Sequence, residues 1–412
     1  MTAVTTRGAW LLACALALAF AACVRSPRAP RGVEVRSGID VLLADLPQVL
    51  EGKRVGLITN HTGIDRLGRR TVDLLAERSD LTLVALFAFE HGLRGDAPPG
   101  EKIASTVDSA TNLPVHSLYG TVRKPTPEML AGLDALIYDV QDVGARPYTR
   151  VSTMALSMQA AAEAGIPFVV LDRPNPIGGV RVEGPVLERA HASFVGMYPI
   201  PLRHGMTVGE LARLYNTEFG IGATLMVVPA HGWRRDMWFD ETGLPWVPTS
   251  PNIRRLEAAL LYPGTVLIEG TNLSEGRGTA HPFEQVGAPW LDARNVVEAM
   301  RARSLPGIAF EATEVAVAPG DAKYAGQTLR AVRFVIRDRE RVDPVRTTLI
   351  LLETIRALHP DEFRWGRSID RLAGTTRVRA AVDSGTVDAF VRAVEREVSA
   401  FAALRAPHLL YR

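Results

Sequence analysis

From residue 53 onward, short apolar runs alternate with amphipathic stretches. Four apolar runs have the length of buried strands: 54–59, 81–89, 135–140 and 167–171. Helical periodicity separates these runs at 71–78, 127–133 and 153–165. The second helix has proline near its start and the third ends at glycine. Strands separated by helices require right-handed crossovers, so we predict an α/β fold with a Rossmann-like parallel sheet.

The pattern becomes mixed after Gly205. Helices are predicted at 208–219, 345–358 and 387–404, and strands at 224–229 and 330–336. This is typical of a second, smaller α/β or α+β domain. We therefore divide the body into a Rossmann-like catalytic domain at 37–205 and an auxiliary domain at 206–412 that contributes to a cleft.

The first residues have the pattern of an export signal. Arg7 precedes an apolar stretch at 9–22, which is too short for a typical spanning helix, and Cys23 follows it. The small residues before Cys23 resemble a bacterial lipobox, so we expect a signal peptide at 1–23, a lipid anchor on Cys23 and a tether at 24–36. Plain secretion is the alternative. We therefore expect a periplasmic or outer-envelope protein.

Composition excludes several functions. The chain has 412 residues and is 47% hydrophobic, enough for a large core. Its net charge of +2, with both signs interspersed, gives no clustered basic face for nucleic acid. Both cysteines, Cys14 and Cys23, lie in the signal, so the mature body has no thiol nucleophile. No G-x-G-x-x-G follows the first strand, so nucleotide binding has no support.

A short polar loop follows each of the four predicted strands. These loops occupy 59–63, 90–95, 141–146 and 173–176. Because parallel strands end at the same edge of a sheet, the loops should meet where α/β proteins bind their ligands. That arrangement indicates an enzyme.

Glu90 is the foremost candidate for catalysis. It stands where an apolar strand ends, and His91-Gly92 follow it. Apolar Phe87 and Phe89 beside a carboxyl group favour its protonated form, which suits a general acid. The alternative is a solvated glutamate that pairs with Arg94.

Three arginines are candidates for binding an acidic substrate. Arg146, Arg173 and Arg203 follow strands or polar loops, and a guanidinium can bind a carboxylate through two parallel hydrogen bonds. The alternative is that these arginines form salt bridges with neighbours such as Asp142 that fix the loops.

Two further features suggest a ligand. The segment 269–279 is dense in polar residues and glycine, and Glu284 follows it. Aromatic side chains offer a flat face for a sugar ring, or else pack in the core: Tyr148, Trp233, Trp238, Trp246 and Trp290.

A metal site is the weaker hypothesis. The hypothesis places His61, His91 and His204 in loops that converge with Asp142, and imidazole plus carboxylate is a zinc-binding set. No H-E-x-x-H or comparable spacing is present, so we predict no metal and no cofactor.

The chain resembles the NamZ-type exo-β-N-acetylmuramidases, a family long catalogued as a domain of unknown function. The resemblance spans roughly 35–412 and rests on LITNHTG, EHGLRGD, YDVQDVGAR, LDRPNPIGG, VEGP, RHGMTVGELA, GTNLSEGRGT and PFE. It implies release of N-acetylmuramic acid from the non-reducing end of peptidoglycan fragments by a Rossmann-like domain with a smaller partner domain.

The resemblance places the family's proposed catalytic glutamate on Glu90. Phe89 stands before it where proline is common in the family. Glycoside hydrolysis needs a second group, for which Asp142, Glu269 and Glu284 are candidates unless the substrate's acetamido group serves. The predicted substrate-binding residues are Asn60, His61, His91, Arg94, Arg146, Arg173, Arg203, His204, Asn272 and Arg277. The competing hypothesis is a non-catalytic, lipid-anchored binder of muropeptides.

Overall fold

The computed structural model describes residues 34–90, 92–94, 105–320 and 322–412. The predicted signal peptide, Cys23, most of the tether and His91 lie outside the described residues. The segment from Glu34 to Arg412 forms one compact unit. None of the helices in the described ranges is long and apolar enough to cross a membrane.

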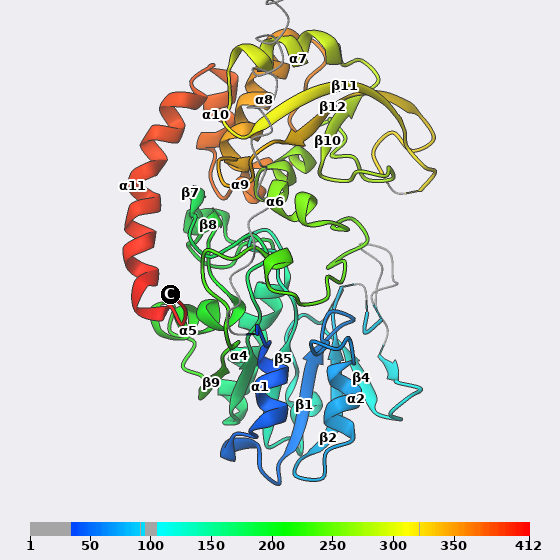
Figure 1. Cartoon of the computed structure of the whole chain (residues 1–412), viewed down its shortest axis with the longest axis vertical. Helices are drawn as coiled ribbons and strands as arrows, with labels where there is room; N and C mark the ends of the chain where they lie inside the picture. Colours follow the sequence, from blue (N-terminus) through cyan, green and yellow to red (C-terminus); the bar gives the residue numbers. More distant parts are fainter. Residues whose placement is uncertain (1–33, 91, 95–104, 321) are drawn as a thin grey trace, which may run out of the picture. The chain divides into compact units, whose positions relative to one another are not determined.

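The main sheet has seven strands in the order β3-β4-β2-β1-β5-β6-β9 (Figure 1). Their bounds are β1 Arg54–Thr59, β2 Thr82–Ala88, β3 Thr106–Val107, β4 Pro114–Ser117, β5 Ala135–Asp139, β6 Phe168–Leu171 and β9 Leu225–Val228. Neighbouring strands are parallel, except for β3 with β4. The predicted Rossmann-like α/β fold is confirmed.

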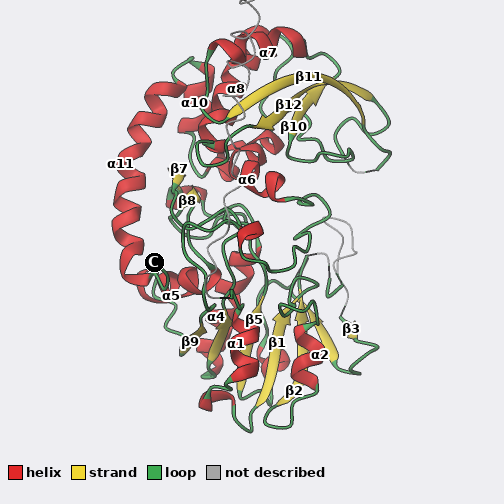
Figure 2. Cartoon of the chain, viewed as in Figure 1, coloured by secondary structure: helices red, strands yellow, loops and turns green. Residues whose placement is uncertain are grey.

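Helices cover both faces of this sheet (Figure 2). They are α1 Gly38–Ala44, α2 Thr71–Ala76, α3 Pro127–Leu130, α4 Arg150–Ala164 and α5 Val208–Glu218. Successive strand residues point to opposite faces. Leu57 of β1 packs in the core with α1 and α2, whereas Ile58 packs in the core with α3, α4 and α5. The sheet is therefore buried on both sides, as its continuous apolar runs predict.

The predicted helices are present with shifted ends. Pro127 occupies the first turn of α3, and the hydroxyl of Thr126 caps that helix. Helix α4 starts at Arg150, three residues before the predicted start at 153, and ends at Ala164 with Gly165 as its C-cap. Gly165 has a φ of +67°, which glycine adopts without a steric penalty.

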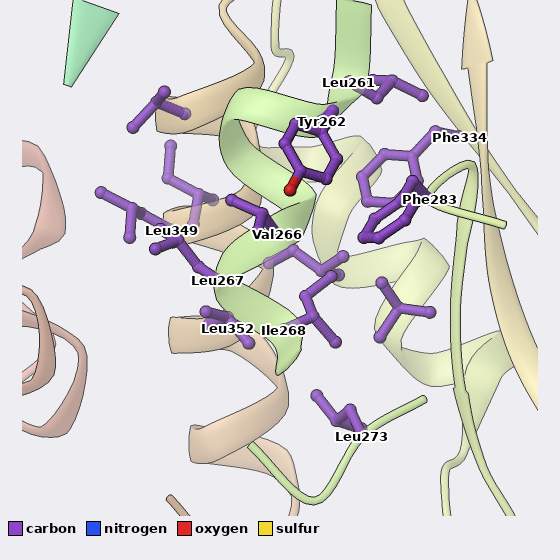
Figure 3. Packing of buried hydrophobic residues seen from close by; sticks show 14 of the residues in the cluster. Leu261, Tyr262, Val266, Leu267, Ile268, Leu273, Phe283, Phe334, Leu349 and Leu352 are labelled. Carbon is purple, nitrogen blue, oxygen red and sulfur yellow. The ribbon is translucent and has the colours of Figure 1, made fainter. Parts of the chain in front are cut away.

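The second half contains a smaller antiparallel sheet in the order β10-β12-β11. Its strands are β10 Gln285–Ala288, β11 Ile308–Ala316 and β12 Thr328–Ile336. The helices are α6 Leu256–Thr265, α7 Ala293–Ala302, α8 Pro344–Leu358, α9 Ile369–Ala373, α10 Arg377–Asp383 and α11 Val387–Arg405. Figure 3 shows the packed core of this half, where Tyr262 and Phe283 lie among aliphatic side chains.

The predicted boundary near Gly205 is wrong. Strand β9 pairs in parallel with β6, so the residues after Gly205 complete the first sheet instead of starting a new domain. The elements of the second half begin with α6, at Leu256. A small hairpin of β7 Glu183–Val186 and β8 Pro201–Arg203 lies between β6 and α5 in the chain.

Candidate active site

A cavity of about 150 Å³ lies at the carboxyl edge of the main sheet and draws residues from both halves. Its wall includes Glu90, which follows β2, and Thr149 and Arg150, which begin α4. From the second half come Tyr262, Glu269, Arg277 and Phe283. The remaining lining residues are Phe89, Pro147, Tyr148, Val195, Ser250, Ile253, Val266 and Leu372. The site therefore forms where the sequence predicts a ligand to bind.

Glu90 is half-buried, and hydroxyl groups hold both of its carboxyl oxygens. Tyr119, which follows β4, donates its hydroxyl to Oε1 over 3.0 Å. Thr149 donates its hydroxyl to Oε2 over 3.2 Å. Three loops at the edge of the sheet thus converge on one carboxyl group.

Another part of the wall carries an ion network. Arg277 Nη2 lies 2.7 Å from Glu269 Oε1, and its Nε lies 3.1 Å from Glu275 Oε1. Lys323 Nζ lies 3.2 Å from Glu275 Oε2. The Arg277 guanidinium also lies 5.0 Å from the ring centre of Phe283. These contacts fix Arg277 in one orientation.

Burial raises the pKa of Glu269, while the neighbouring Arg277 opposes that rise. A carboxyl group in this environment is easier to protonate than one in water. The network therefore combines a rigid cation with an acid that can exchange a proton.

Aromatic rings line the cavity between these polar groups. Tyr148 meets Tyr262 edge to face with ring centres 5.6 Å apart, and Tyr262 meets Phe283 in the same way at 4.9 Å. Burial raises the pKa of both tyrosines, so their hydroxyls stay protonated at neutral pH. Such rings offer apolar faces to a sugar.

Two family models together cover most of the chain. The model for the N-terminal domain of the exo-beta-N-acetylmuramidase NamZ matches residues 55–257, and the model for its C-terminal domain matches residues 260–411. The chain belongs to the NamZ family. The junction of the two models falls within α6, the first helix of the second half.

Relatives of known name or structure cover nearly the whole chain. The peptidoglycan beta-N-acetylmuramidase NamZ of Bacillus subtilis (strain 168) is 47% identical over 92% of this chain and 92% of its own. A DUF1343 family protein from Bacteroides fragilis NCTC 9343 has a TM-score of 0.86 and 37% identity, covering 94% of this chain and 100% of its own. A second protein of that description from the same organism has a TM-score of 0.74 and 31% identity, covering 92% and 99%.

Among the residues predicted for a NamZ-type site, the cavity brings together Glu90, Glu269 and Arg277. The predicted Glu284 lies elsewhere: its Oε1 is 2.6 Å from Nη2 of Arg255. It is therefore not placed to assist Glu90.

Three of the arginines predicted to bind substrate, Arg146, Arg173 and Arg203, do not line this cavity. Arg146 is 1% exposed and donates to the carbonyl oxygens of Pro185, Ile200 and Leu372. Burial lowers the pKa of Arg146 to about 9, so it is still a cation at neutral pH. Both of its terminal nitrogens are directed at the protein's own backbone, so this geometry favours a structural role for Arg146.

Arg173 and Arg203 form internal salt bridges. Arg173 donates to both oxygens of Asp139, over 2.6 and 2.9 Å. Arg203 lies 3.0 Å from Glu183 and donates to the carbonyl of Ile177. Their placement agrees with the alternative hypothesis, in which these arginines form salt bridges that fix the loops.

Asp142 and His204 lie together but outside the cavity wall. His204 Nε2 is 3.6 Å from Asp142 Oδ2, while Nδ1 accepts from the amide of Met206. Asp142 Oδ2 also accepts from the amide of Gly144 over 2.7 Å. The pair shapes the loop after β5 and does not touch Glu90.

The other predicted side chains hold turns and loops. Asn60 Oδ1 accepts from the amide and hydroxyl of Thr62, and His61 Nε2 contacts the carbonyl of Pro248. Asn272 donates to the carbonyl of Glu362 and accepts from the amide of Arg364. Arg94 is mostly exposed and bonds to Ser109. Across the described ranges, no three His, Cys, Asp or Glu side chains are grouped so as to bind a metal ion.

Three residues that contact Glu90 or support the cavity were not predicted from the sequence: Tyr119, Thr149 and Arg150. The Arg150 guanidinium lies 4.9 Å from the ring centre of Tyr148 and donates to the carbonyl of Gln141, so it supports the cavity floor. Tyr119 follows β4, whose four residues are too few for a clear strand pattern. The rule that polar residues after strands meet at one edge would have found Tyr119 once β4 was recognised.

Proposed function

We propose that this protein is an exo-acting glycoside hydrolase that releases N-acetylmuramic acid from the non-reducing end of peptidoglycan fragments, with Glu90 as general acid. The observation that carries the proposal is the position of Glu90 in a cavity of a NamZ-family fold. Two hydroxyl groups hold its carboxyl group, and Glu269 and Arg277 line the same cavity. A relative 47% identical to this chain is named a peptidoglycan beta-N-acetylmuramidase.

The chemistry requires a proton at the leaving oxygen. The carboxyl group of Glu90 gives its proton to the glycosidic oxygen as the bond from that oxygen to the anomeric carbon breaks, and the bonding electrons stay on the oxygen. Water then supplies the new hydroxyl at the anomeric carbon. The remaining proton of that water passes to a base.

Glu269 is our candidate for the second group. It lines the same cavity as Glu90, and burial raises its pKa and so makes its carboxylate a stronger base, while the ion pair with Arg277 opposes that rise. An ionised carboxylate can take the proton of the water or stabilise positive charge at the anomeric carbon. The substrate's own acetamido group is the alternative partner for that carbon.

Arg277 is our candidate for recognising the lactyl carboxylate of muramic acid. Its Nη2 and Nε already contact Glu269 and Glu275. This arrangement leaves Nη1 as the nitrogen for an incoming carboxylate, in an orientation that is fixed before the substrate arrives. N-Acetylglucosamine lacks the lactyl group, so the contact would distinguish the two sugars.

The size of the cavity supports exo action. Its volume of about 150 Å³ is below the roughly 300–1,000 Å³ of typical pockets for larger ligands. Apolar side chains of Val195, Ile253 and Leu372 close part of the wall. A cavity that is closed on part of its wall admits the end of a glycan strand more readily than its middle.

The test is digestion of a short peptidoglycan glycan of alternating sugars with its reducing end labelled. Exo action from the non-reducing end releases free N-acetylmuramic acid first and leaves the label on a chain one sugar shorter. Labelled pieces that are shorter by two or more sugars at the first time point would point to endo cleavage. Tight binding without any product would favour the non-catalytic binder of muropeptides.

We also propose export and anchoring at the cell envelope, which would bring the enzyme to peptidoglycan. The support is the apolar stretch at 9–22 that ends before Cys23. Mass spectrometry of the mature protein tests this: an acylated Cys23 at the new N-terminus is expected, and an unprocessed Met1 would contradict it.

A further inference from the structure

Thr149 lies at the N-terminus of α4, where a threonine hydroxyl ordinarily caps the helix. Thr149 is the N-cap residue of α4, which has 15 residues, and threonine at this position commonly accepts a hydrogen bond from an amide of the first turn. Thr126 and Thr207 do so at α3 and α5. In α4, all of whose amides belong to described residues, the Thr149 side chain makes no such bond.

The hydroxyl is directed to Glu90 instead. Thr149 Oγ1 donates to Glu90 Oε2 over 3.2 Å, and the backbone of Thr149 is in the helical region with φ −64° and ψ −10°. A capping residue needs a non-helical backbone, so in this conformation the hydroxyl is not placed to cap the first turn. It contacts the carboxyl group of Glu90 instead.

Tyr119 holds the other oxygen from a separate element. Its hydroxyl donates to Oε1 over 3.0 Å. The main chain around Tyr119 is anchored, because the amide of Leu118 donates to the carbonyl of Ala88, the last residue of β2. The Tyr119 amide also donates to the hydroxyl of Ser117. The two hydroxyls therefore reach Glu90 from fixed positions after β4 and β5.

We propose that Thr149 and Tyr119 are positioning residues for proton transfer by Glu90. This inference rests on the proposed function. A hydroxyl both donates and accepts, so each can bond the carboxyl group before and after the proton leaves. When the Glu90 proton moves to the leaving oxygen, the carboxylate that remains accepts two hydrogen bonds whose donors are already in place, and such preorganisation lowers the barrier.

The proposal predicts a dependence on the leaving group. A natural glycan leaves as a poorly acidic sugar hydroxyl and needs the proton, whereas a dinitrophenolate leaves without one. Thr149→Val should lower kcat/KM for the disaccharide N-acetylmuramyl-β-1,4-N-acetylglucosamine by about 10- to 100-fold, the effect of one hydrogen bond to a charged group. The same variant should change kcat/KM for 2,4-dinitrophenyl β-N-acetylmuraminide by less than about threefold.

Several variants separate positioning from folding. Tyr119→Phe should reproduce the leaving-group dependence, and Thr149→Ser should restore activity on the disaccharide. Thr153→Val is the matched control, because its hydroxyl lies on the same helix and bonds the backbone of Thr149 rather than Glu90. Since Thr149 does not cap α4, Thr149→Val should leave Tm within about 2 °C of the unchanged protein.

The outcomes are distinguishable. If the unchanged protein releases no N-acetylmuramic acid, the proposed function fails and the positioning role with it. If Glu90→Gln shows the leaving-group dependence while Thr149→Val and Tyr119→Phe do not, the positioning proposal alone is overturned. Equal losses on both substrates with a lower Tm would assign the two hydroxyls a structural role and also overturn it.

Discussion

Tyr411, the residue before the C-terminus, donates its hydroxyl to the buried carboxylate of Asp172 over 2.6 Å. The two residues are 239 positions apart, and Asp172 directly follows β6 of the main sheet. The hydroxyl of Thr207 donates to the same oxygen over 2.7 Å. Helix α11, which precedes this tail, also contacts the first half through Arg405, which donates to the carbonyls of His204 and Gly205 (Figure 1). The end of the chain therefore ties the two halves together.

Tyr411→Phe should destabilise the protein in a pH-dependent way. Burial raises the pKa of Asp172 to about 6, and the hydrogen bond from Tyr411 opposes that rise. Removing the Tyr411 hydroxyl destabilises the ionised form of Asp172, which predominates in the folded protein at pH 8 but not at pH 4.5. The free energy of unfolding should therefore fall by about 1–3 kcal/mol at pH 8 and by less at pH 4.5. Urea unfolding at both pH values measures it.

The direction of this pH dependence follows from the raised pKa of Asp172. An acid with a higher pKa in the folded state than in the unfolded state loses stability as the pH rises from about 4 to about 6. Tyr198→Phe is the control, because its hydroxyl bonds the neutral amide of Gln159. A loss in Tyr411→Phe that is larger at pH 4.5 than at pH 8 would contradict this account of Asp172.

Arg146→Gln should reduce stability rather than substrate affinity. Its guanidinium satisfies the carbonyls of Pro185, Ile200 and Leu372, and glutamine is too short to reach all three. The free energy of unfolding should fall by about 3 kcal/mol or more, whereas Arg379→Gln, at an exposed pair with Asp370, should change little. Thermal unfolding and KM together measure this; a raised KM at unchanged Tm would restore Arg146 as a substrate ligand.

Arg277→Gln should weaken recognition of muramic acid. Competitive inhibition by free N-acetylmuramic acid should weaken by about 10-fold or more, because a hydrogen bond to a carboxylate is lost. Inhibition by N-acetylglucosamine, which has no carboxylate, should change much less. Inhibition constants against an aryl glycoside provide the comparison. Equal weakening for both sugars would exclude a specific contact with the lactyl group.

The local hydrophobic pattern was sufficient to predict the main sheet and the edge of that sheet at which the cavity lies. The apolar runs of β1, β2, β5 and β6 are continuous because both faces of a parallel sheet are buried, and that signal is visible in the sequence. The hydrophobic pattern also predicts strand β9. Its assignment to the first domain depends on pairing with β6 more than 50 residues earlier, which no local pattern reveals.

The candidate site could be predicted only in part, again because tertiary contacts are not visible in the local sequence. Residue type and position after a strand identified Glu90, whereas the polar, glycine-rich composition of 269–279 and the family resemblance identified Glu269 and Arg277. The same criteria selected Arg146, Arg173 and Arg203, whose partners are backbone carbonyls and carboxylates that lie far away in the sequence. Whether an arginine binds a ligand or the protein itself is decided by tertiary contacts. Thr149 was missed because its role depends on where its hydroxyl is directed.

The central claim is that Glu90 is the general acid. The most direct measurement is release of N-acetylmuramic acid from the disaccharide N-acetylmuramyl-β-1,4-N-acetylglucosamine by the unchanged protein, by Glu90→Gln and by Glu284→Gln. Glu284 pairs with Arg255 outside the cavity, so it is a matched glutamate control. We predict that Glu90→Gln keeps its Tm and loses about 100- to 10,000-fold in kcat, while Glu284→Gln stays within about threefold. Undiminished release by a folded Glu90→Gln variant would contradict the account.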